Sequence, residues 1–378
     1  MRIAIDARFF GPINGGGGIG RYVSELIHSL QKLDHHNEYH LLLTKDSFHE
    51  CLLTAGNFYK HLVHHSPYTF AGQRELPRLL SQINPRFTHF PHWTVPLTYR
   101  KPFLTTLHDV IWLDDPDSRN ATTRHPLING LKRTFFRLSL EKAVHQSRQI
   151  ITPSNYTKQR LLRHFRISPH KITKIAHGLT TPLSGKGVTL SDYGVYAPYF
   201  LTVGNFYPHK NHAFVLNAFR AVADLFPHAA LVLAGKKDHF SMSLEALARS
   251  YNFLPHQIKF IYSPSDEVLG ALYHQSTALV HMAKLEGFGW PPLEALSCGK
   301  PVIASDGGSL PEILGNRAEL VGSNDEQALV GAMLKLLTNA KQSPLTASLS
   351  RAHATEFSWH RAAEQTLEVY SHFGYKLL

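Results

Sequence analysis

Short apolar segments alternate with helix-length segments along the whole chain. Residues 2–7 alternate between polar and apolar side chains, which predicts a strand, and apolar side chains from Tyr22 to Leu33 then recur at helical spacing. The same pattern predicts further strands in the first half at 39–44, 103–107 and 149–152, followed by a helix over 154–165. In the second half the predicted strands lie at 199–203, 231–234, 258–262, 278–281 and 301–305. Strands separated by helices indicate parallel sheets covered on both faces.

The chain is long enough for two such domains. It has 378 residues, and a domain typically has ~150. The segment 180–187 is rich in turn-forming residues and lacks periodicity, so we interpret it as the linker. We expect an α/β protein with a first domain over 1–185, a second over 186–356 and a closing segment over 357–378.

Positive charge is concentrated in one half. The protein is formally +11 at pH 7 with histidine neutral. Residues 1–190 hold 25 basic against 12 acidic residues, a net of +13, whereas residues 191–378 hold 14 against 16, a net of −2. A basic domain favours nucleic acid, an anionic membrane surface or a phosphorylated small molecule as partner. A nucleic-acid binder would need a stacking platform or a known module, and the sequence has neither.

Composition excludes several classes of protein. Hydrophobic residues make up 43% of the chain, which is enough for buried cores and excludes disordered and fibrous proteins. The two cysteines, Cys51 and Cys298, are too few for a disulfide framework and fit a reducing compartment best. No apolar stretch approaches the ~18 residues of a membrane span, and the first residues lack the apolar segment of a secretory signal. We therefore expect a cytoplasmic protein.

The first candidate site is a glycine-rich loop before the first helix. Gly15, Gly17 and Gly20 satisfy the G-x-G-x-x-G pattern, in which backbone amides near a helix N-terminus approach an anion. An NAD(P)-dependent oxidoreductase is therefore an alternative function. That fingerprint places the glycines directly after the first strand, whereas residues 9–14 intervene here, and only Asp46 qualifies as its acidic ribose ligand. A loop that approaches phosphate or moves at the active site is favoured, and a merely flexible surface loop is a further alternative.

Two further candidates follow predicted strands, where open parallel sheets bind ligands. His108 and Asp109 come directly after the strand 103–107. An imidazole and a carboxylate there suit hydroxyl binding or proton transfer, although either residue could simply cap a loop. Lys210 follows the strand 199–203 just before a helix, where a cation and helix amides together suit a diphosphate.

The most specific motif places two carboxylates on either side of a glycine loop. Glu286 is followed by Gly287, Phe288 and Gly289, and then by a helix that two prolines start and that carries Glu294. Two carboxylates so placed can bind two hydroxyl-bearing parts of one ligand, with the loop amides between them. Two unrelated surface glutamates are the alternative, which the flanking glycines and the double proline disfavour.

These segments resemble the signature of the retaining GT-B glycosyltransferases of family 4. The resemblance rests on residues 286–294, 299–305 and 308–312, and landmarks from residue 5 to residue 210 extend it over most of the chain. The closing segment, from Phe357-Ser358-Trp359 to Tyr370, resembles the mannosyltransferase branch. The resemblance implies two Rossmann-like domains that face each other across a cleft, with residues 357–378 crossing back to the first domain.

The resemblance also implies a role for each matching residue. Glu286 would bind the transferred sugar, Glu294 the donor ribose, and His108 the 6-hydroxyl of the sugar. Lys210 would stabilise the departing diphosphate. Further donor-binding candidates are Gly17, Gly18, Gly287, Phe288 and Gly289, and acceptor-side candidates are Asp109 and Arg21. No metal or other cofactor is expected, because lysine and amides take its place and the second half has no Asp-x-Asp motif.

Three more donor-binding candidates depart from the family pattern. Asn205 stands where many members have arginine, and His209 stands where the mannosyltransferase branch often has one. One phosphate-binding cation is therefore missing or replaced by histidine. Tyr262 stands where glycine is frequent, near the site of the nucleotide base, which leaves the base open. GDP-mannose is the favoured donor.

The acceptor is expected to meet the basic half. Two predicted helices there carry basic residues: Arg124, Lys132, Arg133 and Arg137 around Phe135 and Phe136, then Lys158, Arg160, Arg163 and Arg166. Such surfaces suit an anionic membrane, with a solvated basic face as the alternative. We expect a protein peripheral on the inner face of the plasma membrane that uses a glycan or a lipid-diphosphate-linked saccharide as acceptor in cell-surface polysaccharide synthesis. The resemblance further implies a retaining reaction, for which front-face displacement is the hypothesis.

Overall fold

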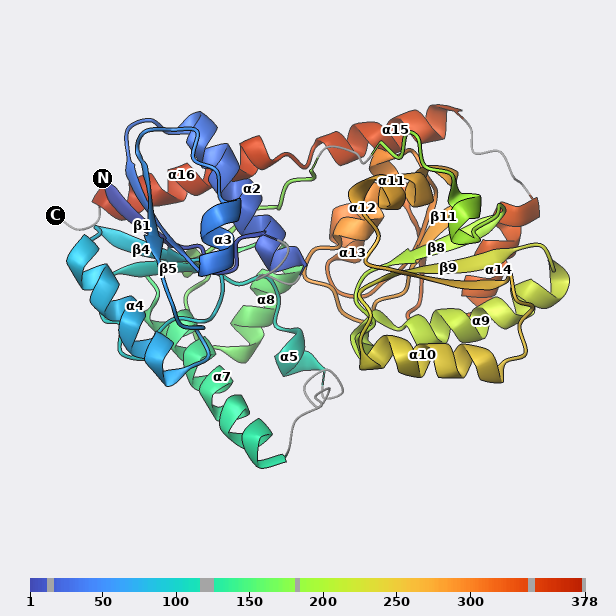
Figure 1. The fold of residues 1–378 in the computed structure, drawn as a ribbon, viewed down its shortest axis with the longest axis horizontal. Helices are drawn as coiled ribbons and strands as arrows, with labels where there is room; N and C mark the ends of the chain where they lie inside the picture. Colours follow the sequence, from blue (N-terminus) through green and yellow to red (C-terminus); the bar gives the residue numbers. More distant parts are fainter. Residues whose placement is uncertain (12–16, 116–125, 181–183, 339–343, 376–378) are drawn as a thin grey trace. The chain divides into compact units, whose positions relative to one another are not determined.

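The apolar strand segments pair into two parallel sheets, each in a unit of its own, in the computed structural model of the chain (Figure 1). The structure describes residues 1–11, 17–115, 126–180, 184–338 and 344–375, without the side chains of 126–133 and 373–375. The first unit comprises Met1–Val110, Thr122–Thr180 and Ser358–Leu378, and the second comprises Ile111–Ala121 and Thr181–Phe357. The chain thus passes between units near Thr180, within the segment interpreted as the linker.

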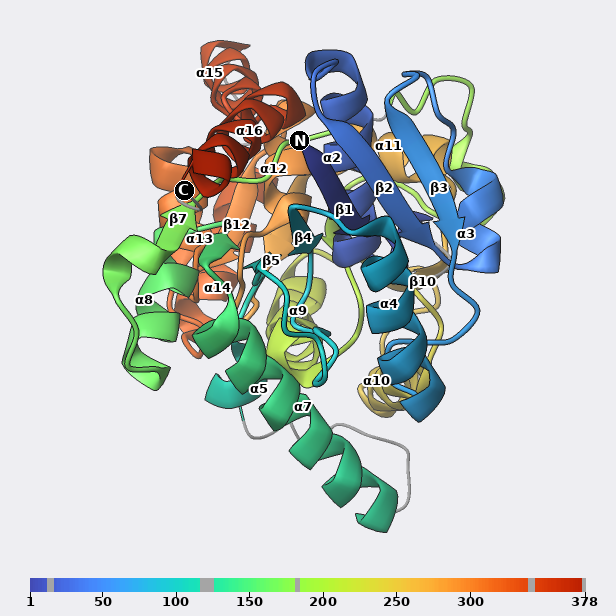
Figure 2. The same cartoon turned by 90° about the vertical axis from the view of Figure 1, so that its left-hand side faces the viewer.

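The first unit contains a seven-stranded sheet in the order β3-β2-β1-β4-β5-β6-β7, and all neighbours in it are parallel. Its strands are β1 (Arg2–Asp6), β2 (Glu38–Leu43), β3 (Phe58–Leu62), β4 (Phe87–Phe90), β5 (Phe103–Thr106), β6 (Gln149–Thr152) and β7 (Ile172–Lys174). Its helices include α2 (Gly18–Leu33), α3 (Lys45–Glu50), α4 (Phe70–Ile83), α7 (Pro126–Gln146), α8 (Asn155–His164) and α16 (Trp359–Tyr375). Helices α2 and α16 cover one face of the sheet, and α4 and α7 cover the other (Figures 1 and 2).

The second unit contains a six-stranded parallel sheet in the order β10-β9-β8-β11-β12-β13. Its strands are β8 (Tyr199–Val203), β9 (Ala230–Gly235), β10 (Ile258–Tyr262), β11 (Ala278–His281), β12 (Val302–Ser305) and β13 (Glu319–Val321). Its helices include α5 (Ile111–Asp114), α9 (His212–Leu225), α10 (His239–Ser250), α11 (Asp266–Gln275), α12 (Trp290–Ser297), α13 (Leu310–Leu314), α14 (Glu326–Thr338) and α15 (Pro344–Thr355). Helices α9 and α10 lie on one face and α11 and α12 on the other (Figure 1).

Both sheets therefore have the same strand order up to their sixth strand. In each, the chain adds strands in one direction and then returns to the other side of its first strand. This reversal lies between β1 and β4 in the first unit and between β8 and β11 in the second. The loops after these strands diverge, which makes both reversals preferred ligand sites in open parallel sheets.

All nine predicted strands are present, with ends shifted by no more than one residue. The pattern missed β3, β7 and β13, which lie at sheet edges, and the interior strand β4. Edge strands bury one side less completely, so their apolar runs are interrupted. Strand β4 buries Thr88 and His89, whose polar side chains have partners inside the protein: Thr88 bonds to Tyr99 at 2.7 Å.

The last helix, α16, packs against α2 within the first unit. The Tyr370 side chain is fully buried, and its hydroxyl is hydrogen bonded to His89 Nδ1 at 2.7 Å. The Trp359 ring stacks on His177 with a centroid distance of 6.0 Å. Glycine is required at Gly178, because a Cβ there would collide with the Trp359 backbone. Within the described residues, no helix is both long and apolar enough to cross a membrane.

Candidate functional site

The loops after β8 and β11 meet where the second sheet reverses its strand order. The loop after β8 ends in a 3-10 turn, Pro208–Lys210, and Asn211 then begins α9 in a left-handed conformation with φ 61°. The Lys284 backbone N–H in the loop after β11 donates to the His209 carbonyl at 2.7 Å. The two loops are thus joined through their backbones.

An ion pair joins the side chains of the same two loops. Lys210 Nζ lies 2.6 Å from Glu286 Oε2, and the two side chains are only 13% and 12% exposed. His281, the last residue of β11, places its Nε2 atom 3.7 Å from the same carboxylate oxygen. Two predicted site residues therefore contact each other, and a third group that the sequence did not single out joins them.

The protonation of this cluster follows from its contacts. Burial alone would raise the pKa of the Glu286 carboxyl, but the Lys210 ammonium and the His281 imidazole outweigh it and hold that pKa well below its usual range. The pKa of His209 is lowered to about 4, by burial and then by Lys210. At neutral pH the histidine that stands in place of an arginine is uncharged. Within residues 204–210, all of which are described, Lys210 then carries the positive charge.

The glycine loop after Glu286 has a fixed backbone. Ser309 donates its backbone N–H to the Glu286 carbonyl at 3.0 Å and its hydroxyl to the Phe288 carbonyl at 3.1 Å. Gly308, at φ +66°, lies against Glu286 so closely that a Cβ there would strike its backbone. The Phe288 ring is buried, and Gly289, at φ +97°, ends the loop. The loop between the two predicted carboxylates is therefore held in one conformation.

Glu294 lies on α12, which the two prolines start as predicted. Its side chain is buried, and its Oε2 atom accepts a hydrogen bond from the Tyr273 hydroxyl at 2.6 Å. Tyr273 belongs to α11 and is itself fully buried. A buried tyrosine thus orients the carboxylate, and no pattern in the sequence connected these two residues.

The other two residues that depart from the family pattern, Asn205 and Tyr262, differ in their surroundings. The Asn205 carbonyl accepts a hydrogen bond from His212 Nε2 at 3.0 Å, while the Asn205 side chain is exposed. The Tyr262 hydroxyl donates to Glu245 Oε1 at 2.6 Å, and burial together with this bond raises its pKa to about 12. Lys237 lies over the Tyr262 ring, 5.4 Å from its centroid. Tyr262 is therefore a neutral hydrogen-bond donor that Glu245 already engages.

In the first unit, His108 is engaged through both ring nitrogens. Its Nε2 donates to the Pro91 carbonyl at 2.8 Å, so its Nδ1 accepts from His177 Nε2 at 3.1 Å. Burial lowers the pKa of His108 to about 4, so the ring is neutral. A sugar hydroxyl could bond to either nitrogen only by sharing or replacing one of these partners. Its partner His177 was not among the predicted site residues.

The remaining candidates lie around α2 and after β5. Arg21 donates its Nε–H to Thr180 Oγ1 at 3.1 Å, and Thr180 in turn donates to Glu25 at 2.9 Å. Asp109 is exposed. Gly17, at φ +93°, and Gly18 are exposed at the start of α2, whereas Gly15 lies outside the described residues.

Two family models match the two halves of the chain. Residues 16–181 match the family described as Glycosyltransferase Family 4, and residues 196–352 match the family described as Glycosyl transferases group 1. Together they cover most of the chain. The chain belongs to the group 1 glycosyltransferases. This membership removes the oxidoreductase alternative built on Gly15, Gly17 and Gly20, and the nucleic-acid binder with it.

Relatives and solved structures agree with this assignment. The glycosyltransferase is 28% identical over 270 residues to the O-antigen chain mannosyltransferase RfbU of Salmonella typhimurium, across 70% of this chain and 69% of that protein. It is 26% identical over 289 residues to the O-antigen chain mannosyltransferase B of Escherichia coli, across 75% and 73% of the two chains. Sucrose-phosphate synthase from Thermosynechococcus elongatus matches its structure with a TM-score of 0.76 at 18% identity over 98% of both chains. The predicted α/β, GT-B fold is thereby confirmed.

Proposed function

We propose that this glycosyltransferase moves a mannosyl residue from GDP-mannose to a glycan or lipid-linked saccharide in cell-surface polysaccharide synthesis, with retention of configuration. The names of the two relatives, both O-antigen chain mannosyltransferases, support mannose as the sugar and cell-surface polysaccharide synthesis as the process. The donor sugar would bind at the strand reversal between β8 and β11.

The Lys210–Glu286 pair is the observation that carries the proposal. A nucleotide-sugar donor combines a dianionic diphosphate with a hydroxyl-rich sugar. A largely buried ammonium matches the first, and an ionised carboxylate that accepts hydrogen bonds matches the second. Because the leaving group is an anion, a preorganised cation beside it stabilises the transition state more than the ground state.

The donor nucleoside would be held on the neighbouring elements. The Glu294 carboxylate, which Tyr273 orients, is suited to the ribose hydroxyls, and the Gly287, Phe288 and Gly289 amides are suited to sugar and phosphate oxygens. In this scheme Tyr262 would lie near the base and Asn205 near the diphosphate. No metal is required in this scheme, since the Lys210 ammonium and the loop amides stabilise the departing diphosphate.

The retaining reaction is proposed as a front-face displacement. The bond between the sugar C1 and the diphosphate oxygen breaks, and the acceptor oxygen bonds to C1 from the same face. The acceptor proton passes to the departing phosphate oxygen. The products are a nucleoside diphosphate and a glycoside with the configuration of the donor, and the protein forms no covalent intermediate.

The first unit would attach the enzyme to an anionic membrane surface at the inner face of the plasma membrane. Arg163 at the end of α8 and Arg166 just beyond it are exposed. Lys158, by contrast, donates its Nζ–H to the Ile172 carbonyl at 3.0 Å, and Phe136 packs on Trp93 at 4.2 Å between ring centroids. The residues Arg124, Lys132 and Arg133 have no described side chains. Arg137 is exposed but forms an ion pair with Glu141 at 2.9 Å. The membrane proposal is therefore argued from Arg163 and Arg166.

A donor screen tests the proposal. The purified protein is incubated separately with GDP-mannose, UDP-glucose, UDP-galactose and ADP-glucose, and sugar release is followed by proton NMR. We expect GDP-mannose to be consumed at least about tenfold faster than the others and to release the α-anomer first. Faster turnover of a UDP-sugar would contradict the donor, and initial release of the β-anomer would contradict retention.

A further inference from the structure

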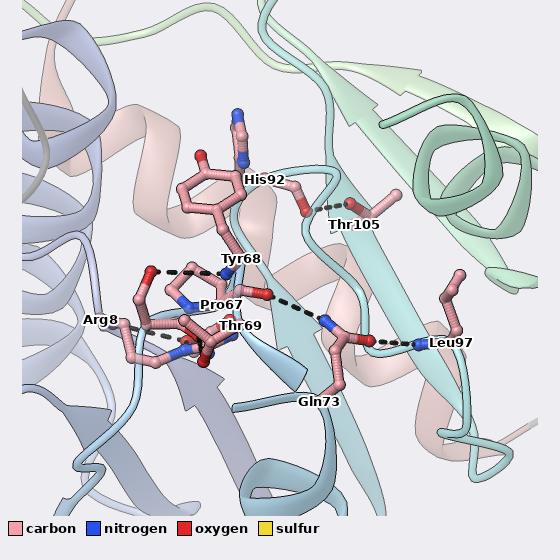
Figure 3. Close-up of polar contacts among 10 residues, drawn as sticks. Arg8, Pro67, Tyr68, Thr69, Gln73, His92, Leu97 and Thr105 are labelled. Carbon is pink, nitrogen blue, oxygen red and sulfur yellow. Dashed lines mark hydrogen bonds and ion pairs between the residues drawn. The ribbon is translucent and has the colours of Figure 1, made fainter. Parts of the chain in front are cut away.

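Three loops of the first unit meet at the carboxyl edge of its sheet. Arg8 and Phe9 follow β1, Tyr68 follows β3, and His92 follows β4. Figure 3 shows the Tyr68 and His92 rings projecting from their two loops in the same direction. This edge includes the strand reversal between β1 and β4, which the donor proposal does not use.

The loops after β3 and β4 are tied together by a buried glutamine. Gln73 on α4 donates its side-chain amide N–H to the Pro67 carbonyl at 2.9 Å and accepts from the Leu97 backbone N–H at 2.8 Å (Figure 3). The His92 carbonyl accepts from Thr105 of β5 at 3.1 Å. The backbones on both sides are therefore fixed, and Tyr68 and His92 are held in place by the fold.

Aromatic rings form a continuous row across these loops. The Tyr68 and Trp93 ring centroids are 6.0 Å apart, those of Trp93 and His92 are 4.6 Å apart, and those of His92 and Phe9 are 5.1 Å apart. At one end of the row Tyr68 is 49% exposed. A large, rigidly supported aromatic ring open to solvent suits the apolar face of a pyranose, which stacks on such rings.

Polar atoms beside this row are buried without using their full hydrogen-bonding capacity. His92 is 8% exposed, and its Nδ1 atom has no hydrogen-bond partner among the described residues. The same holds for Arg8 Nη1 within the described part of the chain, although Arg8 Nε and Nη2 both bind Asp6 at 2.7 Å. Buried polar atoms are nearly always paired, so these atoms point to a ligand.

The cluster carries no net charge. The Arg8 guanidinium is neutralised by Asp6, and both side chains are almost completely buried. Burial, together with the nearby His108 and Arg8, lowers the pKa of His92 well below its usual range, so the imidazole is neutral. A neutral imidazole offers both a donor and an acceptor, which matches a sugar hydroxyl better than a phosphate group.

We propose that Tyr68, Trp93 and His92 form the binding site for the terminal, uncharged hexose of the acceptor. The sugar ring stacks on the exposed face of Tyr68, and one hydroxyl bonds to His92 Nδ1. Arg8 supplies a further donor through Nη1. This inference rests on the proposed function, because it assigns a substrate to the glycosyltransferase, but its residues are separate from those assigned to the donor.

Saccharide binding to the full chain tests the site. Methyl α-mannopyranoside, methyl α-glucopyranoside and methyl α-galactopyranoside are titrated by saturation-transfer NMR, and GDP is titrated in parallel. The variants are Tyr68→Ala, Tyr68→Phe and His92→Phe, the last of which keeps a ring against Trp93. Tyr59→Ala is the matched control, because Tyr59 is 47% exposed on β3 of the same unit and lies outside the row.

At least one glycoside is expected to bind the wild-type chain. Tyr68→Ala should weaken the affinity for that glycoside about tenfold. Tyr68→Phe keeps the ring, so its affinity should stay within about threefold of the wild-type value. His92→Phe should weaken the same glycoside, and Tyr59→Ala should change nothing. All variants should bind GDP like the wild type. The proposal is overturned if no glycoside binds, or if Tyr68→Ala and His92→Phe bind as well as the wild type. Tyr68-dependent glycoside binding without any GDP binding would support this site and contradict the proposed donor instead.

Discussion

The two units share a strand order but differ in the chemistry at their strand reversals. In the second unit, a cation and an anion contact each other, Lys210 and Glu286 at 2.6 Å. In the first unit, the corresponding edge carries neutral histidines, aromatic rings and a guanidinium that Asp6 neutralises. Both edges therefore contain a buried ion pair, but in the second unit that pair belongs to the proposed donor site, whereas in the first unit it lies beside neutral histidines and aromatic rings.

This difference does not follow the overall charge distribution. The first half of the sequence has a net charge of +13 and the second half −2. Part of the positive charge of the first half lies on exposed residues such as Arg163 and Arg166. Net charge thus indicates which partners the solvent-exposed surface favours, whereas the chemistry of the site depends on local contacts.

Removing the cation of the second unit should have the largest effect. Lys210→Ala leaves the departing diphosphate without its stabilising charge, and we expect kcat for GDP-mannose to fall about 100- to 1000-fold. Lys335→Ala is the matched control, because Lys335 forms an exposed ion pair with Glu319 on the same unit. A Lys210→Ala enzyme that keeps more than half of the wild-type kcat would exclude Lys210 from catalysis.

Neutralising the anion should lower stability in a pH-dependent way. Glu286→Gln leaves the largely buried Lys210 without its counter-charge, which we expect to cost about 3 kcal/mol at pH 7. Because the folded-state pKa of Glu286 is depressed, its contribution is fully present above the unfolded-state value of ~4.3 and declines as the pH falls below it. Urea unfolding of both proteins at pH 7 and at pH 3 measures this. A stability gap that stays constant or widens in acid would contradict the ion pair.

Partitioning onto lipid vesicles tests the two units against each other. Replacing Arg163 and Arg166 by alanine should weaken partitioning onto anionic vesicles at low salt about 30-fold, since each cation near the surface contributes ~1 kcal/mol. The control replaces Arg249 and Lys335, two exposed cations of the second unit, and should change partitioning little. Equal losses in both double variants, or equal partitioning of the wild type onto neutral and anionic vesicles, would contradict a membrane-facing first unit.

The smallest effect is expected at the buried hydrogen bond that secures α16. Tyr370→Phe removes the partner of His89 Nδ1 and should lower the free energy of unfolding by about 1–2 kcal/mol. Tyr207→Phe, at an exposed position, should leave it unchanged. Thermal unfolding of the two variants measures the difference, and equal stabilities would mean that the Tyr370 hydroxyl contributes nothing.

The sequence predicted the parts of the fold that depend on continuous apolar runs. Most of the nine predicted strands are buried along nearly their whole length, so their apolar composition identified them. Strand β4 was missed because its buried Thr88 and His89 look like surface residues until their partners are known. Lys210 and Glu286 were predicted as site residues from two separate motifs that follow strands, and the structure brings their side chains together in a contact that neither motif predicted.

The supporting residues of the site could not be predicted. Tyr273 orients Glu294 from a different helix, His177 engages His108 from a position 69 residues away, and Gln73 joins two loops of the first unit. These contacts depend on tertiary packing, and no spacing rule in the sequence connects them. One supporting residue, His281, could have been found in the sequence, because it is a polar residue at the end of an otherwise apolar strand.

Nucleotide binding to three proteins tests the central claim, that the donor charge is met by Lys210 and not by the basic surface of the first unit. GDP is titrated against intrinsic tryptophan fluorescence in the wild type, in Lys210→Ala and in the Arg163→Ala, Arg166→Ala double variant. We expect Lys210→Ala to weaken GDP binding at least about tenfold, whereas the double variant should bind GDP like the wild type. Unchanged affinity in Lys210→Ala, together with a loss in the double variant, would contradict the claim.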